Sequence, residues 1–125
     1  MISFVMPIHN EEEGISKFLD EEFLPIVQEI SGYEKEIILV NDGSTDKTLS
    51  ILQEYAKKNK EIRVVALSRN FGKEPALSAG IYVARGDAII TIDADGQQPP
   101  KLIPKFIEKW EKGAEIVTGV RRRVL

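Results

Sequence analysis

The sequence contains no cysteine and only one histidine. Without cysteine, the chain can hold no disulfide framework, no thiolate zinc site and no cysteine nucleophile. Long apolar stretches are also missing, because the longest uncharged run, residues 75–84, is only half as long as a membrane-spanning helix. The short apolar segment at residues 2–6 lacks a preceding basic region and does not resemble a secretory signal. The sequence therefore predicts a soluble, cytoplasmic protein.

Two common phosphate-binding motifs are absent as well. No Gly-x-Gly-x-x-Gly segment follows a predicted strand, and no Gly-x-x-x-x-Gly-Lys-Ser/Thr segment occurs, which argues against a dinucleotide site and a P-loop. The single histidine, His9, belongs to no plausible serine-histidine-acid combination of the kind that makes a catalytic triad. His9 is therefore either part of the edge of a ligand pocket or an ordinary turn residue.

The chain has 125 residues, of which 42% are apolar and 30% charged, so we expect one globular domain over residues 1–125. The net charge of −3 is unevenly distributed. Residues 1–54 contain 12 acids and 3 bases, whereas residues 55–125 contain 8 acids and 14 bases. Most of these charges are expected on solvated helix faces. Three adjacent arginines at positions 121–123 are either a solvated tail or a site for an anionic partner.

Apolar strand patterns alternate with helical patterns along the chain. The predicted strands are residues 2–6, stopped by Pro7, and residues 36–40, 62–67, 88–92 and 115–118. Helices are predicted after residue 14, ended or kinked by Pro25, after caps at residues 44–46, over residues 75–84 and from Pro99 to Gly113. This alternation predicts an α/β fold, an open and mostly parallel sheet with helices on both faces. In such sheets, ligands bind beyond the carboxyl ends of the strands.

Acidic residues follow three of the predicted strands. Glu11 follows the first strand and Asp42 the second, although helix-dipole stabilisation and turn chemistry are alternative explanations for these two. Asp93 and Asp95 follow the fourth, and alternate residues of an extended segment point the same way. Two converging carboxylates are unfavourable unless a cation lies between them. This pair therefore predicts a metal site.

The ligand types around this pair favour one class of metal. The available donors are carboxylate oxygens and the amide oxygens of Gln97 and Gln98, which favour Mg²⁺ or Mn²⁺ over zinc or copper. Mg²⁺ held by one or two carboxylates usually completes its coordination with water and substrate phosphates, so the site predicts a diphosphate ligand. Lys73, at the start of a predicted helix, could add positive charge there.

Four segments carry a resemblance to a known family: Pro7-Ile-His-Asn-Glu11, Val40-Asn-Asp-Gly-Ser-Thr-Asp46, Ser68-Arg-Asn-Phe-Gly-Lys73 and Asp93-Ala-Asp-Gly-Gln-Gln-Pro-Pro100. Together they resemble the family 2 glycosyltransferases of the GT-A fold. The set most resembles the polyprenyl-phosphate branch, which includes dolichol-phosphate mannose synthases and bacterial undecaprenyl-phosphate glycosyltransferases. The resemblance covers residues 2 to about 121. It implies an inverting, metal-dependent transfer of a hexose from UDP-hexose or GDP-hexose.

The resemblance also implies roles for individual residues. Pro7, His9 and Glu11 match the segment that lines the base and ribose, although many relatives carry tyrosine in place of His9. Asp42 matches the aspartate that contacts the base, and Lys73 a basic position near the nucleotide and its phosphates. The catalytic and metal-binding DxD pair matches Asp93 and Asp95, with Gln97 assisting the metal. Gln98 departs from the Asp or His common at its position, and Arg121 matches an arginine thought to face the acceptor phosphate.

GT-A enzymes usually extend well beyond the length of this sequence. We therefore interpret residues 1–125 as the donor-binding half of a longer protein, without the acceptor half and any membrane segments. A lipid phosphate is already anionic and needs cationic positioning by Arg121 to Arg123 in place of a general base, which predicts a polyprenyl phosphate acceptor at the cytoplasmic face of the membrane. The alternatives are a family 2 enzyme acting on a sugar or glycan and a non-catalytic, receiver-like domain that binds Mg²⁺.

Overall fold

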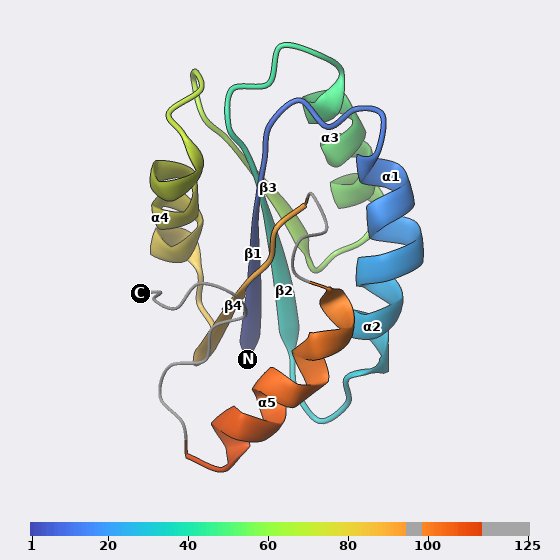
Figure 1. Cartoon of the computed structure of the whole chain (residues 1–125), viewed down its shortest axis with the longest axis vertical. Coiled ribbons are helices and arrows are strands. Elements are labelled where there is room, and N and C mark those ends of the chain that lie inside the picture. Colours follow the sequence, from blue (N-terminus) through green and yellow to red (C-terminus); the bar gives the residue numbers. More distant parts are fainter. Residues whose placement is uncertain (95–98, 114–125) are drawn as a thin grey trace.

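A computed structural model covers the whole chain, and it describes residues 1–94 and 99–113. Four parallel strands form its sheet: β1 (Ile2–Ile8), β2 (Lys35–Asn41), β3 (Ile62–Ala66) and β4 (Ala88–Thr91). Their order across the sheet is β3-β2-β1-β4 (Figure 1). The chain therefore leaves β1 toward one side for β2 and β3 and crosses to the other side for β4. This confirms the predicted α/β fold with a parallel sheet.

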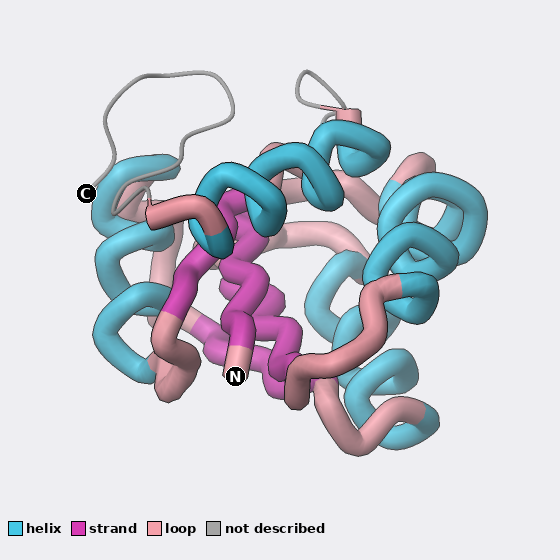
Figure 2. The backbone as a smooth tube through the Cα atoms, turned by 90° about the horizontal axis from the view of Figure 1, so that it is seen from below, coloured by secondary structure: helices cyan, strands magenta, loops and turns pink. Residues whose placement is uncertain are grey.

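Helices cover both faces of this sheet (Figures 1 and 2). One face carries only α4 (Lys73–Val83) among the helices that the structure describes. The other face carries α3 (Thr48–Lys58), α5 (Ile103–Glu111) with the preceding 3₁₀ turn η2 (Pro100–Leu102), and a continuous helical segment composed of α1 (Ile15–Lys17), the π-helical η1 (Phe18–Phe23) and α2 (Leu24–Glu29). None of the helices in the described ranges is long and apolar enough to cross a membrane.

The core is divided by the sheet into two parts. Alternate residues of β1 and β2 point to opposite faces, and both sets are apolar, as expected for central parallel strands. The larger part lies under α1 to α3 and α5 and includes Phe4, Met6, Ile37, Leu39, Leu52 and Phe106. The smaller part lies under α4 and comprises Val5, Ile38, Val40 and Ala76. Helix α4 approaches this face closely at Gly80, where an added Cβ would lie 2.4 Å from Val5 Cγ1.

The prediction that Pro7 stops the first strand is wrong, because β1 continues to Ile8. Pro7 pairs with Val40 of β2, whereas the pairing of β1 with β4 ends at Val5 and Thr91. The last bond on that side joins the Ile92 N–H to the Val5 carbonyl. Odd-numbered β1 residues bond toward β4, so the N–H that proline lacks would have faced the side where pairing has already ended. Proline is tolerated there without breaking the bonds to β2.

Pro25 was expected either to end or to kink the first helix, and it does not end it. Residues 15–29 stay helical, with π-helical hydrogen bonding over Phe18–Phe23 immediately before the proline. Proline removes one helical N–H and crowds the carbonyl of the preceding turn. A wider π turn is a known way to accommodate such a disruption.

The predicted caps of α3 divide into two groups. The N-cap is Lys47, which makes no side-chain capping bond, but the residue before it, Asp46, accepts the Thr48 N–H of the first helical residue through Oδ1 at 2.9 Å. Ser44 and Thr45 do not cap this helix, because the Ser44 hydroxyl accepts the Asn10 N–H and the Thr45 N–H donates to the Asn10 side chain. These two residues therefore hold the loop after β1. The predicted strand 115–118 lies outside the described residues.

A buried polar network closes the amino end of the sheet, opposite the carboxyl edge. Glu36 accepts hydrogen bonds from the Ser3 hydroxyl and the Arg85 N–H, both at 2.6 Å, and from Arg63 at 3.1 Å. Burial by itself would raise the pKa of Glu36, but the Arg85 N–H, the Ser3 hydroxyl and the Arg63 charge together hold this pKa below its usual value. The network joins β1, β2 and β3 to the residues that follow α4.

Candidate functional site

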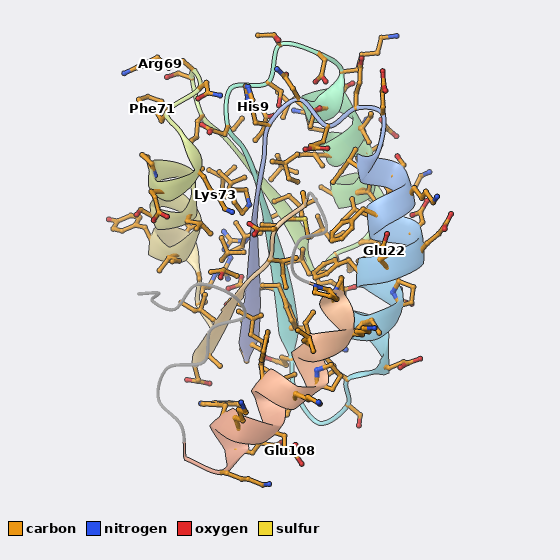
Figure 3. The ribbon with its side chains drawn as sticks, viewed as in Figure 1. His9, Glu22, Arg69, Phe71, Lys73 and Glu108 are labelled. Atoms are coloured by element: carbon orange, nitrogen blue, oxygen red, sulfur yellow. The ribbon has the colours of Figure 1, made fainter. Side chains whose placement is uncertain are left out.

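A pocket of about 270 Å³ lies at the carboxyl edge of the sheet, beyond the ends of β1, β2 and β4. It is lined by Pro7, Ile8, His9, Glu11, Asp42, Asn70, Gly72, Lys73, Asp93 and Ala94. Figure 3 shows His9 and Lys73 on this edge, with Arg69 and Phe71 on the loop that leads into α4. The pocket therefore occupies the place where the chain crosses from one side of β1 to the other, which is where ligands bind in open α/β sheets.

An ion pair lies within the pocket lining. Lys73 Nζ is 2.5 Å from Asp93 Oδ1. The Asp93 side chain is 11% exposed and the Lys73 side chain 41%, so a largely buried carboxylate is neutralised by a cation that reaches solvent. Lys73 is the first residue of α4, and Asp93 is the second residue after β4. Two segments from opposite sides of β1 thus bring one cation and one anion to the same place.

Asp42 also reaches the loop before α4, through its carboxylate. Its Oδ1 accepts the Phe71 N–H at 2.8 Å, and its Oδ2 accepts the Gly72 N–H at 3.0 Å. The residue is 3% exposed. A buried carboxylate requires such donors, and hydrogen bonds to a charged acceptor are among the stronger ones. Asp42 therefore joins the end of β2 to the segment that precedes Lys73.

The next residue, Gly43, packs directly on the same loop. Its φ angle is +64°, and a Cβ at this position would lie 2.1 Å from Arg69 C and 2.2 Å from Asn70 N. No residue with a side chain fits between these backbones, since real Cβ atoms do not approach backbone atoms so closely. Residues 42–43 therefore contact the backbone of residues 69–72, through hydrogen bonds at Asp42 and through direct packing at Gly43.

His9 lies between these two segments. Its Nδ1 atom is 2.7 Å from the Asp42 carbonyl oxygen, and because a carbonyl only accepts, Nδ1 carries the hydrogen and donates it. The Asn10 amide nitrogen lies 3.2 Å from Nε2, and the Asn70 amide nitrogen lies 3.0 Å from Nδ1 and 2.9 Å from Nε2. His9 is therefore an exposed pocket residue held by contacts from three loops, which favours the pocket-edge interpretation over an ordinary turn.

The position of Glu11 depends on the loop after β2. Its N–H donates to Thr48 Oγ1 at 2.9 Å. The preceding residue, Asn10, has a φ of 49° and binds Thr45 and Ser44 of that loop. The following residue, Glu12, donates its N–H to Asp46 and accepts the Lys47 N–H. These reciprocal bonds hold the turn in which Glu11 contributes to the pocket.

Six of the predicted site residues meet at this pocket: Pro7, His9, Glu11, Asp42, Lys73 and Asp93. The predictions for Asp95, Gln97 and Arg121 fall outside the described residues. Asn70 and Gly72 also line the pocket, but sequence reasoning gave them no individual role. The available signal was their place in the segment Ser68–Lys73, where a polar residue and a glycine precede the basic residue.

One candidate ligand for the predicted metal lies among the described residues. In residues 1–94 and 99–113, no group of three His, Cys, Asp or Glu side chains is close enough to hold a metal ion. Asp93 nevertheless suits a hard cation, because it is an oxygen donor and is largely buried, although in this structure Lys73 balances its charge. The described part of the site therefore supplies one ligand that suits Mg²⁺ or Mn²⁺.

The loop before α4 exposes an aromatic side chain, Phe71, which is not among the residues that line the pocket. Phe71 is 42% exposed, and the guanidinium carbon of Arg69 lies 4.2 Å from the centre of its ring. This is the geometry of a cation–π contact. The loop therefore carries a cation stacked on an exposed ring, next in sequence to the pocket-lining residues Asn70, Gly72 and Lys73 (Figure 3).

Comparison with known proteins identifies relatives over almost the whole chain. It is 48% identical over 122 residues to a bactoprenol glucosyl transferase of Shigella phage SfV, with 96% of this chain and 38% of that protein covered. It is 36% identical over 122 residues to an undecaprenyl-phosphate 4-deoxy-4-formamido-L-arabinose transferase of Edwardsiella ictaluri, with 97% of this chain and 37% of that protein covered. The chain thus spans less than two-fifths of the length of these curated relatives.

A solved structure shows the same fold. The mannosyltransferase PcManGT from Pyrobaculum calidifontis, in complex with GDP-Man and Mn²⁺, is 22% identical with a TM-score of 0.69, over 86% of this chain and 31% of that one. The sequence profile of Glycosyl transferase family 2 matches residues 3–125. The chain therefore belongs to glycosyl transferase family 2.

Proposed function

We propose that the protein containing this chain transfers a hexosyl group from UDP-hexose or GDP-hexose to a polyprenyl phosphate, with inversion at the anomeric carbon. The observation that carries the proposal is the ion pair of Lys73 and Asp93 in the pocket at the carboxyl edge of the sheet. This pair places a positive charge that reaches solvent beside a carboxylate, as a diphosphate and its accompanying cation require. The names of the curated relatives support the lipid phosphate acceptor.

Different residues of the pocket are proposed to bind the nucleoside and the diphosphate of the donor. Pro7, His9, Glu11 and Asp42 line the part between the ends of β1 and β2, where we place the nucleoside. Lys73 lies farther toward β4 and provides positive charge for the diphosphate. Asp93 then faces the same diphosphate from the opposite side of β1, and a cation has to stand between the two anions. Asp93, Asp95 and Gln97 are the residues that we propose to hold it.

The transfer breaks the bond between the anomeric carbon and the diphosphate oxygen and forms one bond from that carbon to the acceptor oxygen. Attack from the face opposite the departing diphosphate inverts the configuration, and the nucleoside diphosphate leaves with the bonding electron pair. Mg²⁺ or Mn²⁺, when bound, would neutralise the negative charge that develops on the diphosphate. Lys73 contributes to the same stabilisation from α4, because its side chain reaches solvent and the pocket.

A phosphate acceptor requires no general base, since its oxygen is already anionic. It requires positive charge to position it beside an anionic donor. We propose that Arg121, with the neighbouring arginines, supplies this charge through bidentate hydrogen bonds to the acceptor phosphate. The reaction would take place at the cytoplasmic face of the membrane, where both substrates are accessible to the full-length protein.

A thermal melt tests the donor. UDP-sugars and GDP-sugars are added with and without Mn²⁺, and a ligand at one hundred times its Kd should stabilise the protein by about 2.7 kcal/mol. We expect one nucleotide series to raise the melting temperature, and more so with Mn²⁺. The absence of any effect from both series would contradict the donor site.

The acceptor is tested in the full-length enzyme with Arg121→Ala. We expect a large loss of kcat/KM for the polyprenyl phosphate and little change in KM for the nucleotide sugar. A loss of equal size for both substrates, or no loss at all, would contradict the assignment of Arg121. Transfer to a soluble sugar but not to the lipid phosphate would instead favour an enzyme that acts on glycans.

A further inference from the structure

We infer that Asp42 is a positioning residue, whose carboxylate holds the segment 70–73 so that Lys73 reaches the diphosphate of the donor. The inference rests on the proposed function for the identity of that ligand. It differs from the role that the family resemblance implies, in which the matching aspartate contacts the nucleotide base.

The hydrogen bonds of Asp42 provide the first argument. Each of its two carboxylate oxygens accepts one backbone N–H, from Phe71 and from Gly72. With 3% of the residue exposed, the negative charge is satisfied by this loop and has little contact with solvent. A carboxylate that served only the base would not need two donors from a loop 29 and 30 residues away in sequence.

The packing of Gly43 provides an independent argument. A Cβ at Gly43 would overlap the backbone at Arg69 and Asn70, so the two segments contact each other with no side chain between them. The hydrogen bonds set the distance of residues 71 and 72 from β2, and the backbone contact sets that of residues 69 and 70. Both constraints originate at the end of β2, a central strand that is paired there with β1 on one side and β3 on the other.

The consequence for Lys73 follows from its place in the chain. It is the residue directly after Gly72, and Gly72 has a φ of +107° at the start of α4. The direction in which the chain enters α4 therefore depends on the Gly72 backbone that Asp42 binds. Loss of these two hydrogen bonds would leave α4 packed on the sheet through Ala76 and Gly80 but would release its first residue.

The test compares Asp42→Asn with Asp46→Asn. Asparagine has the same shape, but its amide group cannot accept the second N–H, so one hydrogen bond is lost and a donor faces a donor. Asp46 is a matched control, because its carboxylate also accepts two backbone N–H groups, from Glu12 and Thr48, and it does not line the pocket. Binding of inorganic diphosphate, UDP and GDP is measured by calorimetry in the presence of Mg²⁺.

We expect Asp42→Asn to weaken the binding of inorganic diphosphate about tenfold. The binding of UDP and of GDP should weaken by the same factor. Asp46→Asn should leave the affinity for inorganic diphosphate unchanged, because Asp46 supports the turn of Glu11 on the nucleoside side of the pocket and does not contact the segment that precedes Lys73. In a Lys73→Met background, Asp42→Asn should cause little further loss of diphosphate affinity, because both changes remove the contact between Lys73 and the diphosphate. A loss restricted to UDP or to GDP, with inorganic diphosphate bound normally, would show a base contact and overturn the inference.

Hydrogen exchange of the Phe71 and Gly72 amides gives a second measurement that needs no ligand. We expect Asp42→Asn to remove the protection of at least one of the two amides, and unchanged protection of both would overturn the inference. If the unaltered protein binds neither UDP, GDP nor inorganic diphosphate, the proposed function fails and the role of Lys73 fails with it. Lost amide protection in that case would still show that Asp42 holds the loop, so the two failures are distinguishable.

Discussion

Lys73 and Asp93 form an ion pair, with 2.5 Å between Nζ and Oδ1, although they come from opposite sides of the central strand β1. Lys73 begins the helix on one face, and Asp93 follows the edge strand β4. The two residues meet because the chain crosses from β3 through α4 to β4, which brings the start of α4 next to the end of β4. The pair therefore marks the point where donor binding would couple these two segments.

The first prediction concerns Asp93→Asn. Lys73 is 41% exposed and remains solvated without its partner, so the melting temperature of the free protein should change by only a few degrees. The additional stabilisation that Mn²⁺ gives in the presence of UDP or GDP should disappear. Asp87→Asn is the matched control, because Asp87 pairs with the N-terminus at 3.0 Å and its side chain is 79% exposed. A full Mn²⁺ effect in Asp93→Asn would be incompatible with a metal ligand at this position.

A second prediction concerns the close approach at Gly43. Gly43→Ala introduces a Cβ that overlaps the backbone of residues 69–70, and it also has to adopt a positive φ. We expect a loss of at least about 2 kcal/mol in the free energy of unfolding, measured by urea titration. Gly32→Ala separates the two causes, because Gly32 has a φ of +87° but nothing within 4 Å of the added Cβ. Its expected cost is about 1 kcal/mol, and equal losses in both variants would argue against the backbone contact.

Gly80→Ala provides a third prediction, in which tertiary packing opposes helix propensity. Within a helix, alanine is favoured over glycine by about 1 kcal/mol. At this position the new methyl group would lie 2.4 Å from Val5 Cγ1 and 2.9 Å from Val40 Cγ2, and overpacking costs about 1–3 kcal/mol. We expect a net loss of about 1 kcal/mol on urea unfolding. Gly14→Ala, where nothing lies within 4 Å, should be near neutral, and a stabilised Gly80→Ala would mean that α4 does not pack this closely.

The fourth prediction is the pH dependence that Glu36 confers. Its pKa is lowered in the folded protein from the usual 4.5, so its contribution to stability is complete above that value and is lost as the pH falls through the folded pKa. Glu36→Gln should therefore be less stable than the unaltered protein at pH 7, by about 1–3 kcal/mol. The difference should shrink as the pH is lowered below 4.5. The exposed Glu61→Gln serves as the control and should show no such difference at any pH; a constant difference for Glu36→Gln would contradict the lowered pKa.

The alternation of apolar strands and helices was enough to predict the α/β fold, because two-sided apolar runs such as residues 37–40 are stable only between two layers. The effects of the two prolines were harder to predict. Pro7 is tolerated because β4 ends beside it, and Pro25 because a π turn precedes it. The tolerance of each proline depends on surrounding structure, the end of β4 for Pro7 and the π-helical segment for Pro25, which the local conformational preference of proline does not predict.

By itself, the sequence determined which residues would reach the carboxyl edge. A residue that directly follows a parallel strand lies at that edge wherever the strand stands in the sheet. Pro7, His9, Glu11, Asp42, Lys73 and Asp93 were placed there by their motifs and are found together. Only the tertiary structure decided what each of them contacts. The carboxylate of Asp42 binds a loop 29 and 30 residues further along the chain, and Lys73 pairs with Asp93 across β1, because hydrogen bonds and ion pairs depend on distances that the crossovers of the sheet create.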